Sequence, residues 1–171
     1  MKHPQLIVID GPMGAGKTTV AKLLHKKLIS SAHIGHDRTK FFVSGFDRTP
    51  KENAIAGAVV LAMCSTYLKH GVSVILEQGH KRGELMRPYL RLAKRMKVLV
   101  HVFQIEAKPE TLLRRLAERP TPSEAKSKVS KKRMIENIDS YYENKYPHAI
   151  VISSENLSPT QVTGRIFKLI R

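Results

Sequence analysis

Residues 11–18 read GPMGAGKT and match the pattern G-x-x-x-x-G-K-[ST] at every fixed position. The apolar run Leu6-Ile7-Val8-Ile9 directly precedes them, which predicts a strand that leads through a glycine-rich loop into a helix. Such a loop can direct several backbone N–H groups at a polyphosphate, because glycine lets the backbone turn sharply and approach closely. The segment therefore predicts a nucleoside triphosphate-binding loop at the start of an α/β fold.

Each position of this loop has an expected role in binding ATP and Mg²⁺. Lys17 would place its charge beside the β- and γ-phosphates, and Thr18 would offer its hydroxyl to Mg²⁺. Thr19 would reach the α-phosphate, and the N-terminus of the helix would add its partial positive charge. The nucleotide-binding residues expected in the loop are Gly11, Met13, Gly14, Ala15, Gly16, Lys17, Thr18 and Thr19.

Composition limits the class of protein. The 171 residues predict one domain, 1–171, and neither a signal peptide nor a run long enough to span a membrane is evident, which predicts a soluble cytoplasmic protein. Cys64 is the single cysteine and lies in an apolar stretch, so it is expected to pack in the core. The net charge of +16 favours anionic partners, namely nucleic acid or ATP and phosphate products, although a basic surface can also serve solubility alone.

Apolar runs alternate with helical periodicity along the chain. This alternation predicts a mostly parallel sheet covered on both faces by helices. Strands are expected at 5–10, 32–36, 72–77, 98–105 and 148–152, and helices at 17–29, 51–69, 83–96, 109–119, 127–142 and 159–170. Segment 119–133 contains two prolines and many basic residues, and is expected to be a mobile lid.

Other nucleotide-binding classes fit less well. A guanine-specific switch needs Asn-Lys-x-Asp, but the nearest match, residues 144–147, ends in proline. Large motors and helicases need further domains for which this chain has no room. Small-molecule kinases remain.

The order of motifs resembles that of small P-loop kinases, a group that includes chloramphenicol phosphotransferase, zeta toxins and the kinase domain of polynucleotide 5′-kinases. The resemblance covers nearly the full length. It rests on the loop GPMGAGKTT, Asp37 after the second strand, Glu77 ending the next strand, and the RLAER stretch at 115–119. It implies a three-layer α/β P-loop NTPase fold, with a five-stranded parallel sheet, helices on both faces and a helical lid.

The resemblance also implies catalytic roles. Asp37 would orient or deprotonate the acceptor hydroxyl, and Lys17, Arg115 and Arg119 would stabilise the transferred phosphoryl group. Glu77 would join Thr18 in holding Mg²⁺, directly or through water, or would contact the acceptor, because carboxylates at strand ends face the ligand crevice. Ordinary alternatives remain open: Asp37 could cap a turn, Glu77 could be solvated, and the arginines could end an exposed helix. Arg114 is also an alternative to Arg115 for the clamp.

Acceptor recognition is the least constrained part of the prediction. Polynucleotide kinases often have Arg three residues after the aspartate, where this chain has Lys40. Phe41 and Phe42 could equally belong to the core. The candidate acceptor residues are Asp37, Arg38, Lys40, Phe41, Phe46, Gln78, His80 and Arg82. Adenine is expected near Arg119 and Asn156, by the same resemblance.

Together these features predict an ATP- and Mg²⁺-dependent kinase that acts on a hydroxyl of a small-molecule or nucleoside-like acceptor. A polynucleotide 5′-hydroxyl kinase is the nearest alternative, supported by the basic charge. A nucleoside monophosphate kinase would need arginines for a second phosphate, and Arg38, Arg48 and Arg82 could serve. A regulatory module that hydrolyses ATP slowly is the alternative from another class.

Overall fold

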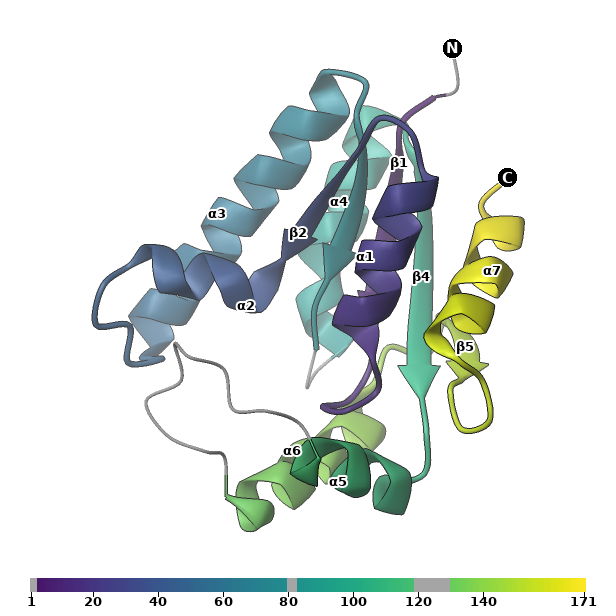
Figure 1. Ribbon diagram of the computed structural model, residues 1–171. Helices are drawn as coiled ribbons and strands as arrows, with labels where there is room; N and C mark the ends of the chain where they lie inside the picture. The colour runs from purple at the N-terminus through teal and green to yellow at the C-terminus, as the bar shows by residue number, and fades with distance from the viewer. Residues whose placement is uncertain (1–2, 80–82, 119–129) are drawn as a thin grey trace.

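The computed structural model describes residues 3–79, 83–118 and 130–171 (Figure 1). His80, Arg82 and Arg119 lie outside the described residues. The same holds for most of the expected lid, since positions 119–129 are not described.

Within the described residues, five parallel strands form one sheet in the spatial order β2-β3-β1-β4-β5. The strands are β1 (Gln5–Asp10), β2 (Ser31–Gly35), β3 (Ser73–Glu77), β4 (Leu99–Glu106) and β5 (Ile150–Ser153). Because all strands are parallel, their carboxyl ends lie along one edge, where open α/β sheets bind ligands. The predicted five-stranded parallel sheet is confirmed.

Helices cover both faces of this sheet (Figure 1). They are α1 (Lys17–Lys27), α2 (His36–Thr39), α3 (Pro50–Lys69), α4 (Arg87–Met96), α5 (Pro109–Ala117), α6 (Lys131–Asn144) and α7 (Pro159–Leu169), with 3₁₀ turns η1 (Lys40–Phe42) and η2 (Gly83–Met86). Successive side chains of a strand point to opposite faces. In β1, Ile7 and Ile9 accordingly pack with α1 and α7, whereas Leu6 and Val8 pack with α3 and α4.

Two of the long helices begin with a capping box. The Thr49 hydroxyl accepts a hydrogen bond from the Glu52 amide at 3.2 Å, and the Glu52 carboxylate accepts one from the Thr49 amide at 3.0 Å. Ser158 and Gln161 make the same exchange ahead of α7. Both helices therefore begin at the proline that the capping pattern indicates.

The chain after β2 departs from the prediction. A strand was expected at 32–36, but β2 covers Ser31–Gly35, and His36 opens the short helix α2. Neither α2 nor η1 was predicted, because elements of three or four residues are too short to show an apolar repeat. This unpredicted turn carries Asp37 to the carboxyl edge of the sheet.

Cys64 is fully buried in α3, as predicted. Burial raises the pKa of its thiol to about 12, so the thiol stays protonated and packs as an apolar group. Among the described helices, none combines the length and the apolar character that crossing a membrane requires.

Candidate active site

The glycine-rich loop between β1 and α1 is tightly packed against its neighbours. Gly11 has φ 151°, and a Cβ added there would lie 2.4 Å from the carbonyl oxygen of Ile105. Gly14 has φ 85°, and a Cβ there would lie 2.8 Å from the carbonyl oxygen of Leu112 in α5. Larger residues would be both strained and sterically blocked, so the loop shape depends on these two glycines.

Lys17 is the first residue of α1 and lies over the loop. Its ammonium group donates a hydrogen bond to the Pro12 carbonyl at 2.9 Å. The chain after β3 also approaches Lys17, since a Cβ added to Gly79 would lie 3.6 Å from Lys17 Nζ. The end of β3 therefore lies against the phosphate loop.

Glu77, the last residue of β3, is held from two sides. The Thr18 hydroxyl donates to Glu77 Oε1, and His33 Nε2 lies 3.1 Å from Glu77 Oε2. Burial alone would raise the pKa of Glu77, but the hydrogen bonds from His33 and Thr18, together with the charge of Lys17, lower it below the ordinary value. Glu77 is therefore ionised at neutral pH.

These residues fit a magnesium ion. Thr18 and Glu77 supply hydroxyl and carboxylate oxygens side by side, and Mg²⁺ prefers oxygen donors. The described residues contain no group of three His, Cys, Asp or Glu that could hold a metal ion. Mg²⁺ commonly needs only one or two carboxylates when phosphates and water complete its coordination, so the pair is sufficient.

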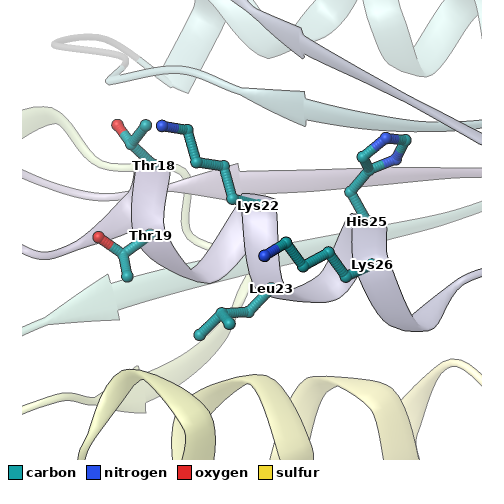
Figure 2. A pocket seen from close by; sticks show the side chains of 6 residues that line it. All are labelled: Thr18, Thr19, Lys22, Leu23, His25 and Lys26. Carbon is teal, nitrogen blue, oxygen red and sulfur yellow. The ribbon is translucent and has the colours of Figure 1, made fainter.

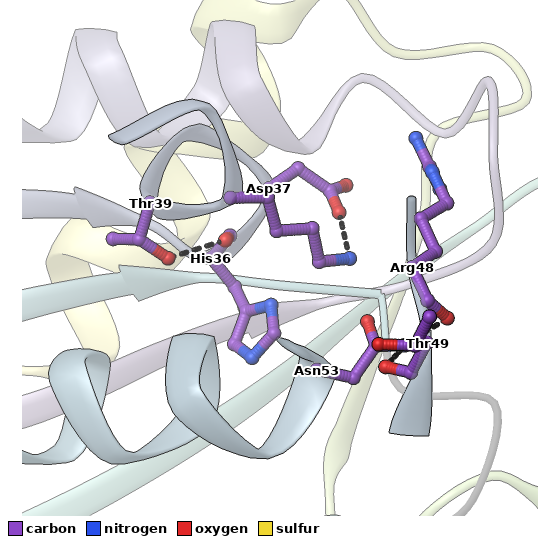
Figure 3. Close-up of polar contacts among 7 residues, drawn as sticks. His36, Asp37, Thr39, Arg48, Thr49 and Asn53 are labelled. Atoms are coloured by element: carbon purple, nitrogen blue, oxygen red, sulfur yellow. Dashed lines mark hydrogen bonds and ion pairs between the residues drawn. The ribbon is translucent and has the colours of Figure 1, made fainter. Parts of the chain in front are cut away.

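Asp37 lies in α2 and forms an ion pair with Lys40, whose Nζ is 2.7 Å from Asp37 Oδ1 (Figure 3). Desolvation would raise the pKa of Asp37, but Lys40, His36 and Lys17 together lower it. Its side chain is 77% exposed, so solvent screens these interactions. The Asp37 carboxylate is therefore ionised at neutral pH and accessible to solvent.

Replacing Lys40 by Met is expected to raise the pKa of Asp37 toward its ordinary value, because the neighbouring cation no longer favours the carboxylate. A ¹³C NMR titration of the aspartate side-chain carboxyls would measure the change. Lys69→Met, at the exposed end of α3, is the matched control and should leave that titration in place. An unchanged Asp37 pKa in the Lys40 variant would contradict the assigned cause.

The segment after Asp37 exposes its aromatic residues. Phe41 is 58% and Phe42 71% exposed, so the core alternative is wrong for both. Phe46 is partly buried and Arg38 is exposed. The loop that follows is anchored to the start of α3, since the Asn53 side chain donates to the carbonyl of Arg48 at 2.7 Å (Figure 3).

Gln78 differs from the other candidate acceptor residues that the structure describes, because it is buried. It is 4% exposed, and its Nε2 lies 3.9 Å from Met86 Sδ. Its backbone amide bonds the Ile9 carbonyl, which continues the pairing of β3 with β1. These contacts indicate a role in packing the end of β3, and its predicted contact with an acceptor stays a prediction.

Arg115, in α5, lies against the chain that follows β5. Its guanidinium donates to the carbonyl and the hydroxyl of Ser154, at 2.7 and 3.0 Å. Ser154 is buried, and its hydroxyl lies 3.1 Å from the Glu106 carbonyl and 3.4 Å from that of Ala15 in the phosphate loop. Arg115 thus joins α5 to the end of β5, and its predicted clamp role stays a prediction.

Two further hydrogen bonds hold the chain that follows β5 against the start of α5. Glu155 accepts hydrogen bonds from the Lys108 amide at 2.7 Å and the Thr111 hydroxyl at 2.5 Å. Asn156, the residue expected near adenine, follows Glu155 and is exposed.

Arg114, unlike Arg115, is exposed and pairs with Glu118 at 3.5 Å. Arg115 is therefore the arginine of this pair that faces the site.

A groove of about 420 Å³ runs along α1 from the phosphate loop. Figure 2 shows the six residues that line it: Thr18, Thr19, Lys22, Leu23, His25 and Lys26. Its far end lies on the order of 10 Å beyond Thr18 along the helix axis, at 1.5 Å per residue. The groove therefore begins at the phosphate-binding end of α1 and leads away from it.

Lys17, Thr18, Asp37 and Glu77 lie at the carboxyl edge of the sheet, and Lys17 is near enough to both carboxylates to help lower their pKa. Sequence reasoning missed His33 and Ser154. His33 could have been found by pairing the expected strands at 32–36 and 72–77 as parallel neighbours. Ser154 had no comparable signal, since its contacts are with distant backbone carbonyls.

A glycine-rich loop between the first strand and the first helix, at the carboxyl edge of a parallel sheet, defines a P-loop nucleotide-binding protein of the α/β class. The chain belongs to the AAA domain family, whose model matches residues 6–143. No curated protein matches the chain.

Solved structures share this fold at low sequence identity. A shikimate kinase from Acinetobacter baumannii is 20% identical, with a TM-score of 0.65 over 98% of this chain and 93% of that one. A putative kinase from Chloroflexus aurantiacus is 15% identical, with a TM-score of 0.73 over 98% of each chain. The Pnkp1/Rnl/Hen1 RNA repair complex contains a chain 16% identical, with a TM-score of 0.71 over 85% of this chain and 46% of that one. The resemblance to small P-loop kinases is thus confirmed at the level of the fold.

Proposed function

We propose that this protein is an ATP- and Mg²⁺-dependent kinase that transfers the γ-phosphoryl group to a hydroxyl of a small-molecule or nucleoside-like acceptor. One observation carries the proposal: Glu77, which accepts a hydrogen bond from Thr18 of the phosphate loop, pairs with Gly35 at the end of the neighbouring strand, two residues before Asp37. Lys17 is near enough to both carboxylates to help lower their pKa. A phosphate-binding cation, a metal-binding carboxylate and a second, accessible carboxylate therefore share one site. A protein that only bound nucleotide would not need the accessible carboxylate of Asp37.

In the proposed reaction, Asp37 accepts the proton of the acceptor hydroxyl, and the hydroxyl oxygen forms a bond to the γ-phosphorus. The bond from that phosphorus to the bridging oxygen of ATP breaks, and ADP leaves with the electron pair. Lys17 and the loop amides stabilise charge on the phosphates, and Thr18 and Glu77 would hold Mg²⁺. The ion supplies further charge neutralisation at the transferred group.

The nucleotide base is proposed to lie beside the chain after β5. Ser154 connects this chain to the phosphate loop, and Arg115 holds Ser154 in place. Asn156 is exposed here and available to a base edge. Arg119, which lies outside the described residues, is proposed to reach the transferred phosphoryl group.

The acceptor is proposed to approach Asp37 from the side of α2 and η1. The exposed ring of Phe41 follows the carboxylate by four residues, the exposed Arg38 adds positive charge, and Lys40 lies partly buried in its ion pair with Asp37. Exposed aromatic and cationic side chains suit an acceptor with a ring and polar or anionic substituents. Phe46, Gln78, His80 and Arg82 complete the proposed set.

A screen of acceptor hydroxyls with γ-labelled ATP would test this proposal. The panel would contain nucleosides, sugars, aminocyclitols, nucleoside monophosphates and oligonucleotides with 5′-hydroxyl ends. The expected result is one class of acceptor that becomes labelled. Release of label only as inorganic phosphate, at a rate independent of every acceptor, would contradict kinase activity and favour a regulatory module.

A polynucleotide 5′-hydroxyl kinase is a second candidate, favoured by the surface of α4. This helix contains no Asp or Glu, and four of its basic side chains are exposed: Arg87, Arg91, Lys94 and Arg95. Arg87, Arg91 and Arg95 recur every fourth residue, so they form a stripe with a spacing of roughly 6 Å. The likeness to a chain of an RNA repair complex supports the same candidate.

If a polynucleotide binds this stripe, its affinity should fall steeply with salt, because each neutralised phosphate releases counterions. Reversing two charges with Arg91→Glu and Arg95→Glu is expected to reduce the slope of log affinity against log salt by roughly 1.4 for a single strand. Fluorescence anisotropy with a labelled 5′-hydroxyl RNA would measure it.

The matched control is the pair Arg165→Glu and Lys168→Glu on α7, which makes the same change in net charge on the other face of the sheet. Equal losses in both double variants would mean that only overall charge matters. That result would remove the support for an oriented polynucleotide on α4.

A further inference from the structure

A buried histidine lies behind the carboxylate proposed to bind magnesium. His33 is in β2, its side chain is 7% exposed, and its Nε2 lies 3.1 Å from Glu77 Oε2. Parallel pairing sets Gly35 opposite Glu77 and His33 opposite Ile75. Glu77 thus lies two residues beyond the partner of His33, so the two side chains are diagonal neighbours on the same face of the sheet.

The two oxygens of Glu77 have different donors. Oε1 accepts from the Thr18 hydroxyl, and Oε2 lies beside His33 Nε2. Because the Thr18 proton is directed at Glu77, the lone pairs of its hydroxyl oxygen stay available for a cation. A donor on each oxygen also restricts rotation of the carboxylate, which a glutamate at a strand end would otherwise retain.

We propose that His33 is a positioning residue, which holds the Glu77 carboxylate in the orientation in which Glu77 and Thr18 together form the Mg²⁺ site. The inference rests on the proposed function, because it assumes that these two residues bind the metal of a metal–nucleotide complex. Only 14% of the Glu77 side chain is exposed, so water cannot fully replace the donor if His33 is removed.

The test uses two variants of His33, of which one keeps an N–H donor and the other does not. His33→Leu removes the donor, whereas His33→Gln keeps an N–H group at a similar distance from the backbone. His70→Gln is the matched control, since His70 is exposed at the end of α3. Mn²⁺ binding to the protein–ATP complex, followed by electron paramagnetic resonance, needs no acceptor and reports on the metal site directly.

The expected result for His33→Leu is metal binding weaker by roughly 10- to 100-fold, the range typical for residues that orient a metal ligand. Metal-free ATP, measured by calorimetry, should bind as in the wild type. His33→Gln should recover most of the metal affinity, and His70→Gln should match the wild type. A thermal melt without nucleotide identifies any loss that is only structural.

Two outcomes would overturn the proposal. One is unchanged Mn²⁺ affinity in folded His33→Leu, and the other is an equal loss in the Gln and Leu variants, which would show that the donor is not what matters. Failure of the wild-type protein to bind Mn²⁺ with ATP would instead contradict the proposed function itself. The two failures are therefore distinguishable.

Discussion

Replacing Asp37 by Asn is expected to slow phosphoryl transfer by roughly 10²- to 10⁴-fold, the usual contribution of a general base, and to leave ATP affinity nearly unchanged. The amide keeps the shape of the side chain but cannot accept the acceptor proton. Asp37 is exposed in α2, so the substitution should not disturb the core. Label transfer would measure the rate, and calorimetry the affinity for ATP.

Asp139→Asn is the matched control, since it makes the same chemical change on an exposed position of α6. It should leave both measurements as in the wild type. Full activity in the Asp37 variant would show that Asp37 serves only as the partner of Lys40. Loss of ATP binding would show that the carboxylate acts in nucleotide binding rather than in transfer.

Local patterns in the sequence predicted much of the fold. The capping boxes at Thr49 and Ser158 depend on residues three apart, and their helices begin at Pro50 and Pro159, against expected starts at 51 and 159. The phosphate loop is also local, because its shape follows from glycines at fixed spacing. Alternation of strands and helices predicted the parallel sheet, since handedness and connection rules leave few arrangements open.

The site was less predictable where it depends on register or on contacts between distant segments. His33 reaches Glu77 only because β2 and β3 pair with one particular register. The sequence places Arg115 on a helix surface. Its hydrogen bonds to Ser154, however, depend on how α5 packs against the chain after β5. Exposure of Phe41 and Phe42 likewise depends on the short turn η1, for which no periodic signal exists.

Replacing Lys17 by Ala is expected to reduce phosphoryl transfer by roughly 10²- to 10³-fold, as for the loss of one donor to a developing charge, and to weaken ATP binding. Lys17 lies over the phosphate loop and influences both carboxylates of the site. Lys168→Ala, on the exposed face of α7, is the matched control. Intact ATP binding and transfer in the Lys17 variant would refute the assignment of the loop.

Lys17→Arg separates charge from shape at the same position. Arginine keeps the positive charge but replaces a compact ammonium with a wide planar group. The ammonium has close neighbours, since the Pro12 carbonyl lies at 2.9 Å and a Cβ added to Gly79 would lie 3.6 Å from Nζ. We therefore expect Lys17→Arg to remain strongly impaired in the same transfer assay. Recovery of activity would show that positive charge alone is sufficient beside the phosphates.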